Sequence, residues 1–306
     1  MRVRILGSAA GGGFPQWNCN CPNCHAVRIG SLSCRPRTQS SIAVSADERH
    51  WFLFNVSPDI QRQIYAFPAL WPRAVVRHTP IQGVVISDAE LDHTLGLLSL
   101  REAGQLHIYA TEWVYTALNE RNPLLRTLSN YCTITWQPVQ LMRLMILHLA
   151  NGADSGLRCQ AFTTHSTKVA AFVGGSVPHQ EASVGYRISD IATGGSLVYL
   201  PAVQELHTGV LDQLPDCACL LIDGTCWEDD ELVRLGIGSK TARVMGHLPI
   251  AGDGGSLEQL AALDVGRVIY IHINNTNPIL IENSPQRQTV EANGIEVAFD
   301  GMELEI

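Results

Sequence analysis

Residues Gly83–Leu100, with the sequence GVVISDAELDHTLGLLSL, decide how the chain is interpreted. Their short apolar run, Val84 to Ile86, predicts a buried strand, and the leucines from Leu95 onward are spaced as on a helix. Three carboxylates on alternate residues and one imidazole lie between these elements: Asp88, Glu90, Asp92 and His93. Because alternate residues of an extended segment point the same way, we expect the three carboxylates to converge.

Two interpretations of these four polar residues are open. Oxygen and imidazole ligands suit a hard or borderline divalent metal, and without a cation the repulsion would keep one carboxyl group protonated. Alternatively, Asp92 caps the following helix and the other side chains are solvated. We favour the metal site because a cap needs one acid, whereas four polar groups are gathered here between two apolar runs.

The composition is that of an acidic globular protein. The chain has 306 residues, of which 46% are hydrophobic and 16% charged, and its formal net charge of -8 does not favour a nucleic-acid partner. There is no apolar run long enough for a membrane span and no signal-peptide pattern, so we expect a cytoplasmic protein. The apolar segments continue without a linker, which predicts one domain over residues 1–306. The oligomeric state stays open, a homodimer included.

A second candidate site is the cysteine cluster Cys19, Cys21 and Cys24, in the spacing C-x-C-x-x-C. With Pro22 fixing the turn, three thiolates can occupy three corners of a tetrahedron around structural zinc, whose fourth ligand must come from elsewhere. The alternatives are three incidental thiols or a redox dithiol. Nine cysteines, an odd number with three clustered, fit a reducing compartment better than a disulfide framework.

Along the chain, apolar runs alternate with helical patterns, which predicts an α/β protein with sheets covered by helices. We expect strands at 3–6, 41–45, 51–56, 84–86, 107–110, 158–164, 184–188, 196–200, 218–222, 243–245 and 267–271, and helices ending near 67, 103 and 120. Five of these strands end in a residue able to bind metal: Asp88, His165, Asp223, His247 and His272. This repetition favours a site built from several strand ends.

The segment Ser87–His93 with Gly96 resembles the T-H-x-H-x-D-H-x-x-G motif of the metallo-β-lactamase superfamily. The resemblance implies an αββα sandwich, in which two central mixed sheets are flanked by helices. His165 then corresponds to the histidine of the third motif, His247 to the late histidine of the ribonuclease Z and phosphodiesterase branch, and His272 to the last ligand. The cysteine cluster is similar to the structural zinc site of phosphodiesterases in carbon-phosphorus lyase pathways, where a histidine stands at the position of Asn275.

The departures from that motif imply different chemistry. The two histidines that hold the first metal in the hydrolases correspond to Asp88 and Glu90, and the bridging aspartate falls at about Ala202, so a standard two-zinc site is not assembled. The remaining residues, Asp92, His93 and His272, resemble the facial triad of non-haem Fe(II) enzymes that activate oxygen. Asp88 and Glu90 are then extra ligands or acceptors that orient His93. His165 and His247 are candidate acid-base groups.

A narrower resemblance rests on the segments SDAELDHTLGL, CNCPNC and GHLPI, which look like those of metallo-β-lactamase-type proteins in the biosynthesis of pyrroloquinoline quinone (PQQ). It implies Fe(II)- and O2-dependent hydroxylation of the tyrosine ring of a small-molecule precursor, a cross-linked Glu-Tyr derivative, in a protein that also holds structural Zn(II). Arg187 or Lys240 would help to hold the carboxylates of that precursor. The alternatives are a carrier of PQQ or its precursor toward the periplasm and a metal-dependent hydrolase.

Overall fold

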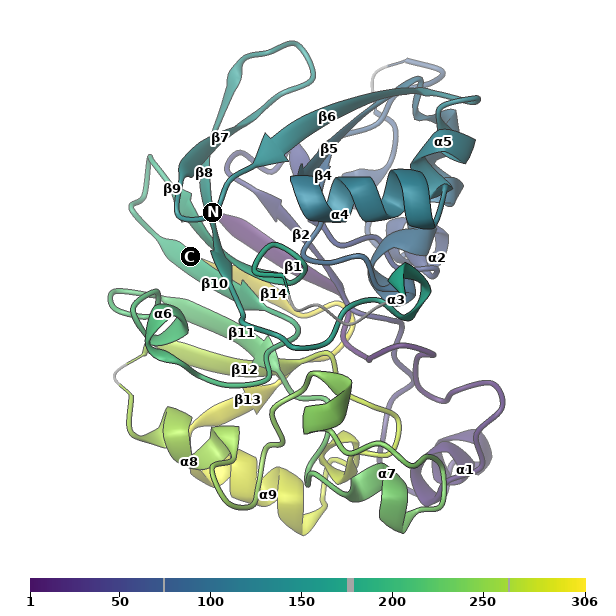
Figure 1. Ribbon diagram of the computed structural model, residues 1–306, viewed down its shortest axis with the longest axis vertical. Helices are drawn as coiled ribbons and strands as arrows, with labels where there is room; N and C mark the ends of the chain where they lie inside the picture. Colours follow the sequence, from purple (N-terminus) through teal and green to yellow (C-terminus); the bar gives the residue numbers. More distant parts are fainter. Residues whose placement is uncertain (74, 175–178, 264) are drawn as a thin grey trace.

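The computed structural model describes residues 1–73, 75–174, 179–263 and 265–306. Two seven-stranded sheets pack against each other, and helices cover both outer faces (Figure 1). The strand orders are β14-β1-β2-β3-β4-β5-β6 and β13-β12-β11-β10-β9-β8-β7. Each sheet is antiparallel in one half and parallel in the other. These layers confirm the expected αββα sandwich with two mixed sheets.

The first sheet contains β1 (Arg2–Gly7), β2 (Ser41–Ser45), β3 (Trp51–Phe54), β4 (Ile81–Val85), β5 (Gln105–Thr111), β6 (Thr133–Val139) and β14 (Glu303–Glu305). The second contains β7 (Leu144–His148), β8 (Asp154–Thr163), β9 (Val184–Asp190), β10 (Ser196–Leu200), β11 (Cys219–Asp223), β12 (Arg267–Ile271) and β13 (Ile295–Val297). The first sheet therefore draws most of its strands from the N-terminal half of the chain, and the second sheet most of its strands from the C-terminal half.

The helices are short. They are α1 (Pro22–Ile29), α2 (Ile60–Tyr65), α3 (Leu91–Thr94), α4 (Glu112–Thr116), α5 (Leu124–Leu128), α6 (Thr208–Leu211), α7 (Glu231–Arg234), α8 (Ser256–Ala261) and α9 (Pro285–Ala292). Turns of 3-10 helix lie at 68–70, 95–103, 171–173, 243–245 and 278–280, and a π-helical turn at 117–121. In Figure 1, α2, α4 and α5 lie over the first sheet, and α8 and α9 over the second. No helix among the described residues is long and apolar enough to cross a membrane.

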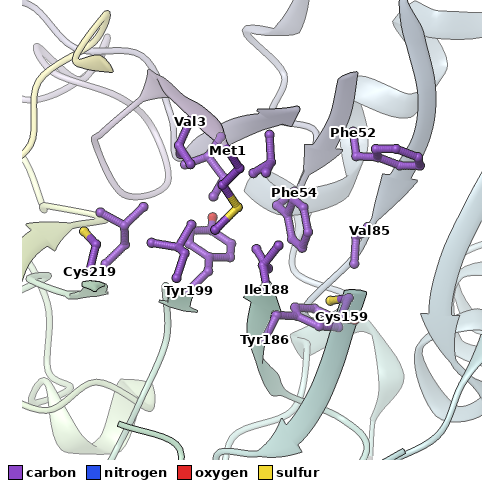
Figure 2. Packing of buried hydrophobic residues seen from close by; sticks show 14 of the residues in the cluster. Met1, Val3, Phe52, Phe54, Val85, Cys159, Tyr186, Ile188, Tyr199 and Cys219 are labelled. Atoms are coloured by element: carbon purple, nitrogen blue, oxygen red, sulfur yellow. The ribbon is translucent and has the colours of Figure 1, made fainter. Parts of the chain in front are cut away.

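The strands bury both faces because successive side chains point to opposite sides of a sheet. In β3, Phe52 and Phe54 face the second sheet, whereas Trp51 and Leu53 face the outer helices. In β10, Tyr199 belongs to the layer between the sheets and Val198 to the outer core. Figure 2 shows the inner layer, where Phe54 packs against Tyr186 and Tyr199 with ring centroids 5.8 and 6.1 Å away.

The strand topology gathers the polar strand ends. In the parallel half of each sheet, neighbouring strands end at the same edge. The residues after β4 and β12 and the last residue of β11 accordingly come together where the two sheets meet: Asp88, His272 and Asp223.

Most of the predicted strands are confirmed, and β2 pairs with β3, and β9 with β10, in antiparallel orientation. The predicted strand at 243–245 is wrong, since these residues form a 3-10 turn that ends at Gly246 with φ of 88°. The helix expected to run to about residue 103 is one α-helical turn, α3, followed by 3-10 turns. The Thr111 side chain caps α4, where it accepts a hydrogen bond from the Val114 amide.

Candidate metal centre

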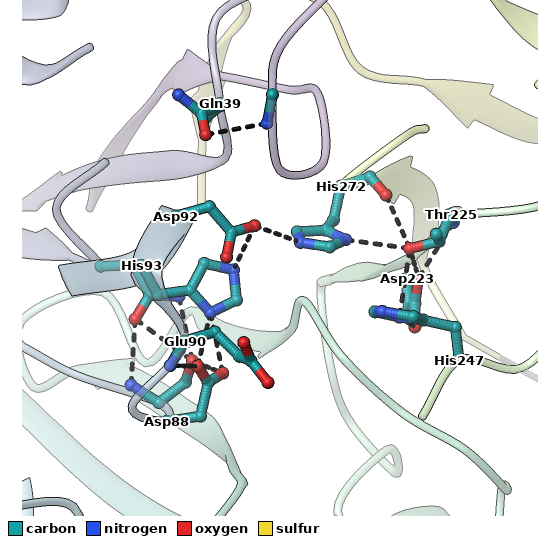
Figure 3. Close-up of polar contacts among 12 residues, drawn as sticks. Gln39, Asp88, Glu90, Asp92, His93, Asp223, Thr225, His247 and His272 are labelled. Atoms are coloured by element: carbon teal, nitrogen blue, oxygen red, sulfur yellow. Dashed lines mark hydrogen bonds and ion pairs between the residues drawn. The ribbon is translucent and has the colours of Figure 1, made fainter. Parts of the chain in front are cut away.

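Asp92, His93 and His272 form the first cluster of possible metal ligands (Figure 3). Asp92 and His93 lie in α3, and His272 directly follows β12. Asp92 Oδ2 is 3.2 Å from His272 Nε2 and 4.0 Å from His93 Nε2. Asp92 lies within α3 and makes no cap, so the alternative interpretation as a helix cap is wrong.

Close backbone contacts hold the two halves of this cluster. The Val56 amide donates to the His93 carbonyl at 2.7 Å. A Cβ on Gly96 would lie 2.0 Å from the Ser57 carbonyl oxygen, so only glycine permits this approach. His272 has a φ of 57°, in the left-handed region that non-glycine residues rarely adopt. The Thr225 hydroxyl oxygen also lies 2.9 Å from the His272 carbonyl oxygen.

Asp88 fixes the orientation of His93. Both of its carboxylate oxygens lie 2.8 to 2.9 Å from His93 Nδ1, and it is itself held by the Ser87 hydroxyl and the Glu90 amide. His93 Nε2, in contrast, is buried and has no hydrogen-bond partner among the described residues. The ring therefore presents Nε2 toward Asp92, as a metal-binding histidine does when a carboxylate holds its other nitrogen.

The expected convergence of the three carboxylates is wrong, because only Asp88 and Asp92 lie beside the His93 ring. Although burial opposes its charge, His93 lies between Asp88 and Asp92, and these carboxylates raise its pKa to about 9. Burial likewise works against ionised Asp88 and Asp92, but the nearby imidazoles outweigh it and hold both pKa values below the ordinary range. The third carboxylate, Glu90, turns away and pairs with Lys168 Nζ at 3.1 Å.

A second cluster contains Asp223, His247 and the same His272. The Thr225 hydroxyl occupies its centre, 2.6 Å from Asp223 Oδ1, 2.9 Å from His272 Nδ1 and 3.1 Å from His247 Nδ1. Asp223 Oδ2 also accepts from His247 Nδ1 at 2.7 Å. Because a hydroxyl already fills the point where these groups converge, we interpret this cluster as a hydrogen-bond network.

This network determines what His272 offers to the first cluster. Burial lowers the pKa of His272, which favours its neutral form. With the Thr225 hydroxyl donating to Asp223, the Nδ1 proton of His272 donates to Thr225, and Nε2 carries a lone pair. Nε2 lies 3.2 Å from an Asp92 oxygen, so it donates to that carboxylate when protonated and offers its lone pair to a metal ion when deprotonated.

The residues of the first cluster fit a metal ion. Ligands about 2.1 Å from a common ion lie about 3 to 4 Å apart, and the Asp92 oxygen lies 4.0 and 3.2 Å from the Nε2 atoms of His93 and His272. A metal ion bound here would take the place of the proton that His93 Nε2 otherwise directs toward Asp92, and would match the charge of that buried carboxylate. These ligands also line a cavity of about 220 Å³, which leaves positions for other molecules.

The cysteine cluster is a separate site. The sulfurs of Cys19, Cys21 and Cys24 lie within 4.8 Å of one another, and the Asn275 amide nitrogen is 3.1, 3.5 and 3.3 Å from them. Burial raises the pKa of Cys21 to about 12, so a thiolate there needs a cation. The Asn275 side chain, three residues after His272, thus lies close to all three sulfurs. All nine cysteines are unpaired.

Other predicted residues lie outside the cavity lining. His165 is exposed and packs against the His207 ring, with centroids 4.1 Å apart. Arg187 on β9 donates to the carbonyl oxygens of Gln213 and Pro215, and Lys240 is exposed. Ala202 and His247 do line the cavity.

Sequence reasoning missed Thr225 and Lys168 and named Asp223 only as a strand end. The sequence signal that could have identified Thr225 is the segment Asp223-Gly224-Thr225 at the end of a buried strand. No local pattern distinguishes Lys168, because its role depends on Glu90 from a distant segment.

Comparison with known proteins places this geometry in context. Residues 50–273 match the model of the beta-lactamase superfamily domain. The chain is 46% identical to coenzyme PQQ synthesis protein B of Azotobacter vinelandii and 45% identical to that of Pseudomonas putida, over 100% of both chains in each case.

Among solved structures, the Zn(2+)-bound PqqB from Methylobacterium extorquens has a TM-score of 0.92 at 38% identity, with 100% of both chains covered. A diphosphatase from the PhnP family has a TM-score of 0.70 at 18% identity, covering 100% of this chain and 97% of the other. The second likeness concerns the fold alone.

Proposed function

The chain belongs to the beta-lactamase superfamily and, within it, to the family of coenzyme PQQ synthesis protein B, and from this premise we propose that it acts in PQQ biosynthesis. More specifically, we propose Fe(II)- and O2-dependent hydroxylation of the tyrosine ring of the cross-linked Glu-Tyr precursor. The observation that carries this proposal is the buried, partnerless Nε2 of His93, which faces Asp92 and His272 beside a cavity.

Asp92, His93 and His272 would hold the metal. One carboxylate and two imidazoles leave coordination positions open, and an iron ion bound there would supply the redox chemistry that side chains lack. Asp88 and the Thr225-Asp223 pair orient the two imidazoles so that both present Nε2. These outer contacts support a preorganised site.

The Asp223-His247 pair provides a group that can hold a proton beside the cavity. Asp223 accepts from His247 Nδ1, which leaves Nε2 for proton exchange with a bound molecule. Hydroxylation replaces a ring C-H bond with C-OH. The second atom of O2 becomes water, which consumes two electrons and two protons from an external reductant. His247 is our candidate to accept the ring proton.

The arrangement of the acids argues against the hydrolase alternative. A two-metal hydrolase needs ligands for a second ion. At the positions of the first-metal histidines, Asp88 is bound to His93 Nδ1 and Glu90 is paired with Lys168. A carrier would need the cavity but not the oriented histidines. The nine unpaired cysteines support a reducing compartment for the protein's work.

The test compares Fe(II) with Zn(II) in protein stripped of its exchangeable metal. With the precursor, O2 and a reductant such as ascorbate, the Fe(II) form should give a product heavier by one oxygen atom, and ¹⁸O2 should label it. The Zn(II) form should be inactive because zinc does not change oxidation state. Equal product with zinc, or product formed without O2, contradicts the proposal.

We also propose that the cysteine cluster binds structural zinc, with the Asn275 amide turning its oxygen to the ion as fourth ligand. A closed tetrahedral site contributes to folding and leaves no position for chemistry. Cys21→Ser should therefore lose one tightly bound zinc and lower the melting temperature by more than about 5 °C. A variant that melts normally and loses only turnover would contradict this role.

A further inference from the structure

We propose that Lys168 is the residue that binds a carboxylate group of the substrate at the cavity. Until substrate binds, the Lys168 ammonium group is paired with Glu90. The identity of the substrate, a Glu-Tyr derivative with several carboxylates, rests on the proposed function. The position of Lys168 at the cavity does not depend on the proposed function.

Charge at the cavity wall is the first argument. Three carboxylates line the cavity, and among its described lining residues Lys168 is the one cation besides histidines. Asp88 and Asp92 both lie beside the His93 imidazole, which lies between them. A molecule with several carboxylates would be repelled from such a wall unless a cation met it. Lys168 is placed to do this.

The ion pair with Glu90 is suited to exchange. The Lys168 and Glu90 side chains are 36% and 29% exposed, and Nζ lies 3.1 Å from Oε1. A partly solvated pair of this kind contributes little to stability, so a second carboxylate can join or replace Glu90 at small cost. In Figure 3 the Glu90 carboxylate extends away from the Asp88-His93 pair.

The backbone and stem of Lys168 are fixed, although its ammonium group is partly exposed. The stem packs over Gly246, where an added Cβ would lie 3.1 Å from Lys168 Cβ. The Ser166 hydroxyl accepts from the Lys168 amide at 3.2 Å, and Gln204 Oε1 accepts from the Thr167 amide at 2.9 Å. The segment that carries Lys168 is therefore held in place beside Gly246, and the ammonium group lies at the cavity.

The two basic residues suggested by sequence do not fill this role. The Arg187 guanidinium is bound to backbone carbonyl oxygens of residues 213 and 215, and neither Arg187 nor Lys240 lines the cavity. Lys240 is exposed, so Lys240→Gln removes the same charge away from the site and serves as the matched control.

The experiment measures binding of the Glu-Tyr precursor, and of the same compound with its carboxyl groups methylated, to the zinc-loaded protein by titration calorimetry. Lys168→Gln should weaken binding of the acid about tenfold, since it removes a charge-assisted hydrogen bond at a partly exposed site, and leave the ester unchanged. Glu90→Gln should bind the acid at least as tightly as wild type, because it frees the ammonium group. Lys240→Gln should match wild type.

The double variant separates substrate binding from a purely structural ion pair. If Lys168 only neutralises Glu90, both single variants weaken binding alike and the double variant restores it, which would overturn the proposal. Equal affinity of wild type and Lys168→Gln for the acid, or equal loss for acid and ester, would overturn it as well. Absence of precursor binding to every form, wild type included, would contradict the proposed function and the substrate named here.

Discussion

Two clusters in this protein have the same composition, one aspartate and two histidines, and share His272, yet their side chains are hydrogen-bonded differently. Around Asp92, His93 Nε2 has no hydrogen-bond partner among the described residues, and His272 Nε2 faces only a carboxylate oxygen. Around Asp223, the Thr225 hydroxyl satisfies the groups that converge. The comparison teaches that unsatisfied donors and acceptors, rather than residue types, distinguish a metal site from a hydrogen-bond network.

The same comparison shows how the clusters depend on each other. His272 turns Nε2 toward Asp92 because Nδ1 is held by Thr225. The second cluster thus acts on the first through one imidazole ring, in the way that outer contacts orient metal ligands.

The largest effect is expected from removing a ligand of the first cluster. His93→Ala or His272→Ala should abolish hydroxylation and the exchangeable metal, because too few ligands remain to hold the ion. Elemental analysis should still find the cysteine-bound zinc, since the two sites use different residues. Retention of both metals by His93→Ala would break the assignment of the first cluster.

The next largest effect is expected at His247, on the other side of the comparison. His247→Ala should keep the exchangeable metal but lower turnover about 10²-fold, the usual contribution of an acid-base group. Metal content and single-turnover rates measured on the same preparation would separate the two effects. If the variant instead loses its metal, the second cluster is a ligand set and our interpretation fails.

Thr225→Val sharpens the comparison because it removes the hydroxyl at nearly constant volume. His272 Nδ1 then loses its acceptor, and we expect metal affinity to fall about tenfold, near the lower limit for loss of an outer contact. Competition with a chelating dye measures this affinity. Unchanged affinity would show that the hydroxyl does not position His272.

The smallest effect is expected at His165. The exposed ring contacts His207 and lies outside the cavity lining, so His165→Ala should change turnover by less than about twofold. A steady-state rate assay beside His247→Ala provides the contrast. A loss as large as that of His247→Ala would mean that His165 acts in the site, as the sequence motif had implied.

The fold was largely predictable because its strands are strongly patterned. Trp51 to Phe54 bury alternate side chains in two different cores, and such runs are recognisable without a structure. The edge strands β6 and β7 were not predicted, since much of each is exposed or half-buried and neither shows a clean alternation. The strand expected at 243–245 failed because three residues carry too little pattern to distinguish a strand from a 3-10 turn.

The candidate site was predictable only where its residues lie close together in the sequence or directly after a patterned strand. Asp92 and His93 were identified from a motif, and His272 from its place after a buried strand. The partners that give these residues their roles come from distant segments. Thr225 meets His272 across two parallel strands, and Lys168 meets Glu90 across the cavity. Such contacts depend on tertiary packing, which no local pattern encodes.

The central claim is that the exchangeable metal binds between Asp92, His93 and His272 and not between Asp223 and His247. The direct test is diffraction from anaerobic Fe(II)-soaked crystals, with data collected on both sides of the iron absorption edge. We predict an anomalous peak within about 2.3 Å of His93 Nε2, His272 Nε2 and an Asp92 oxygen, with the Thr225 hydroxyl still bonded to His272 Nδ1. A peak between Asp223 and His247, with Thr225 displaced, would contradict the account.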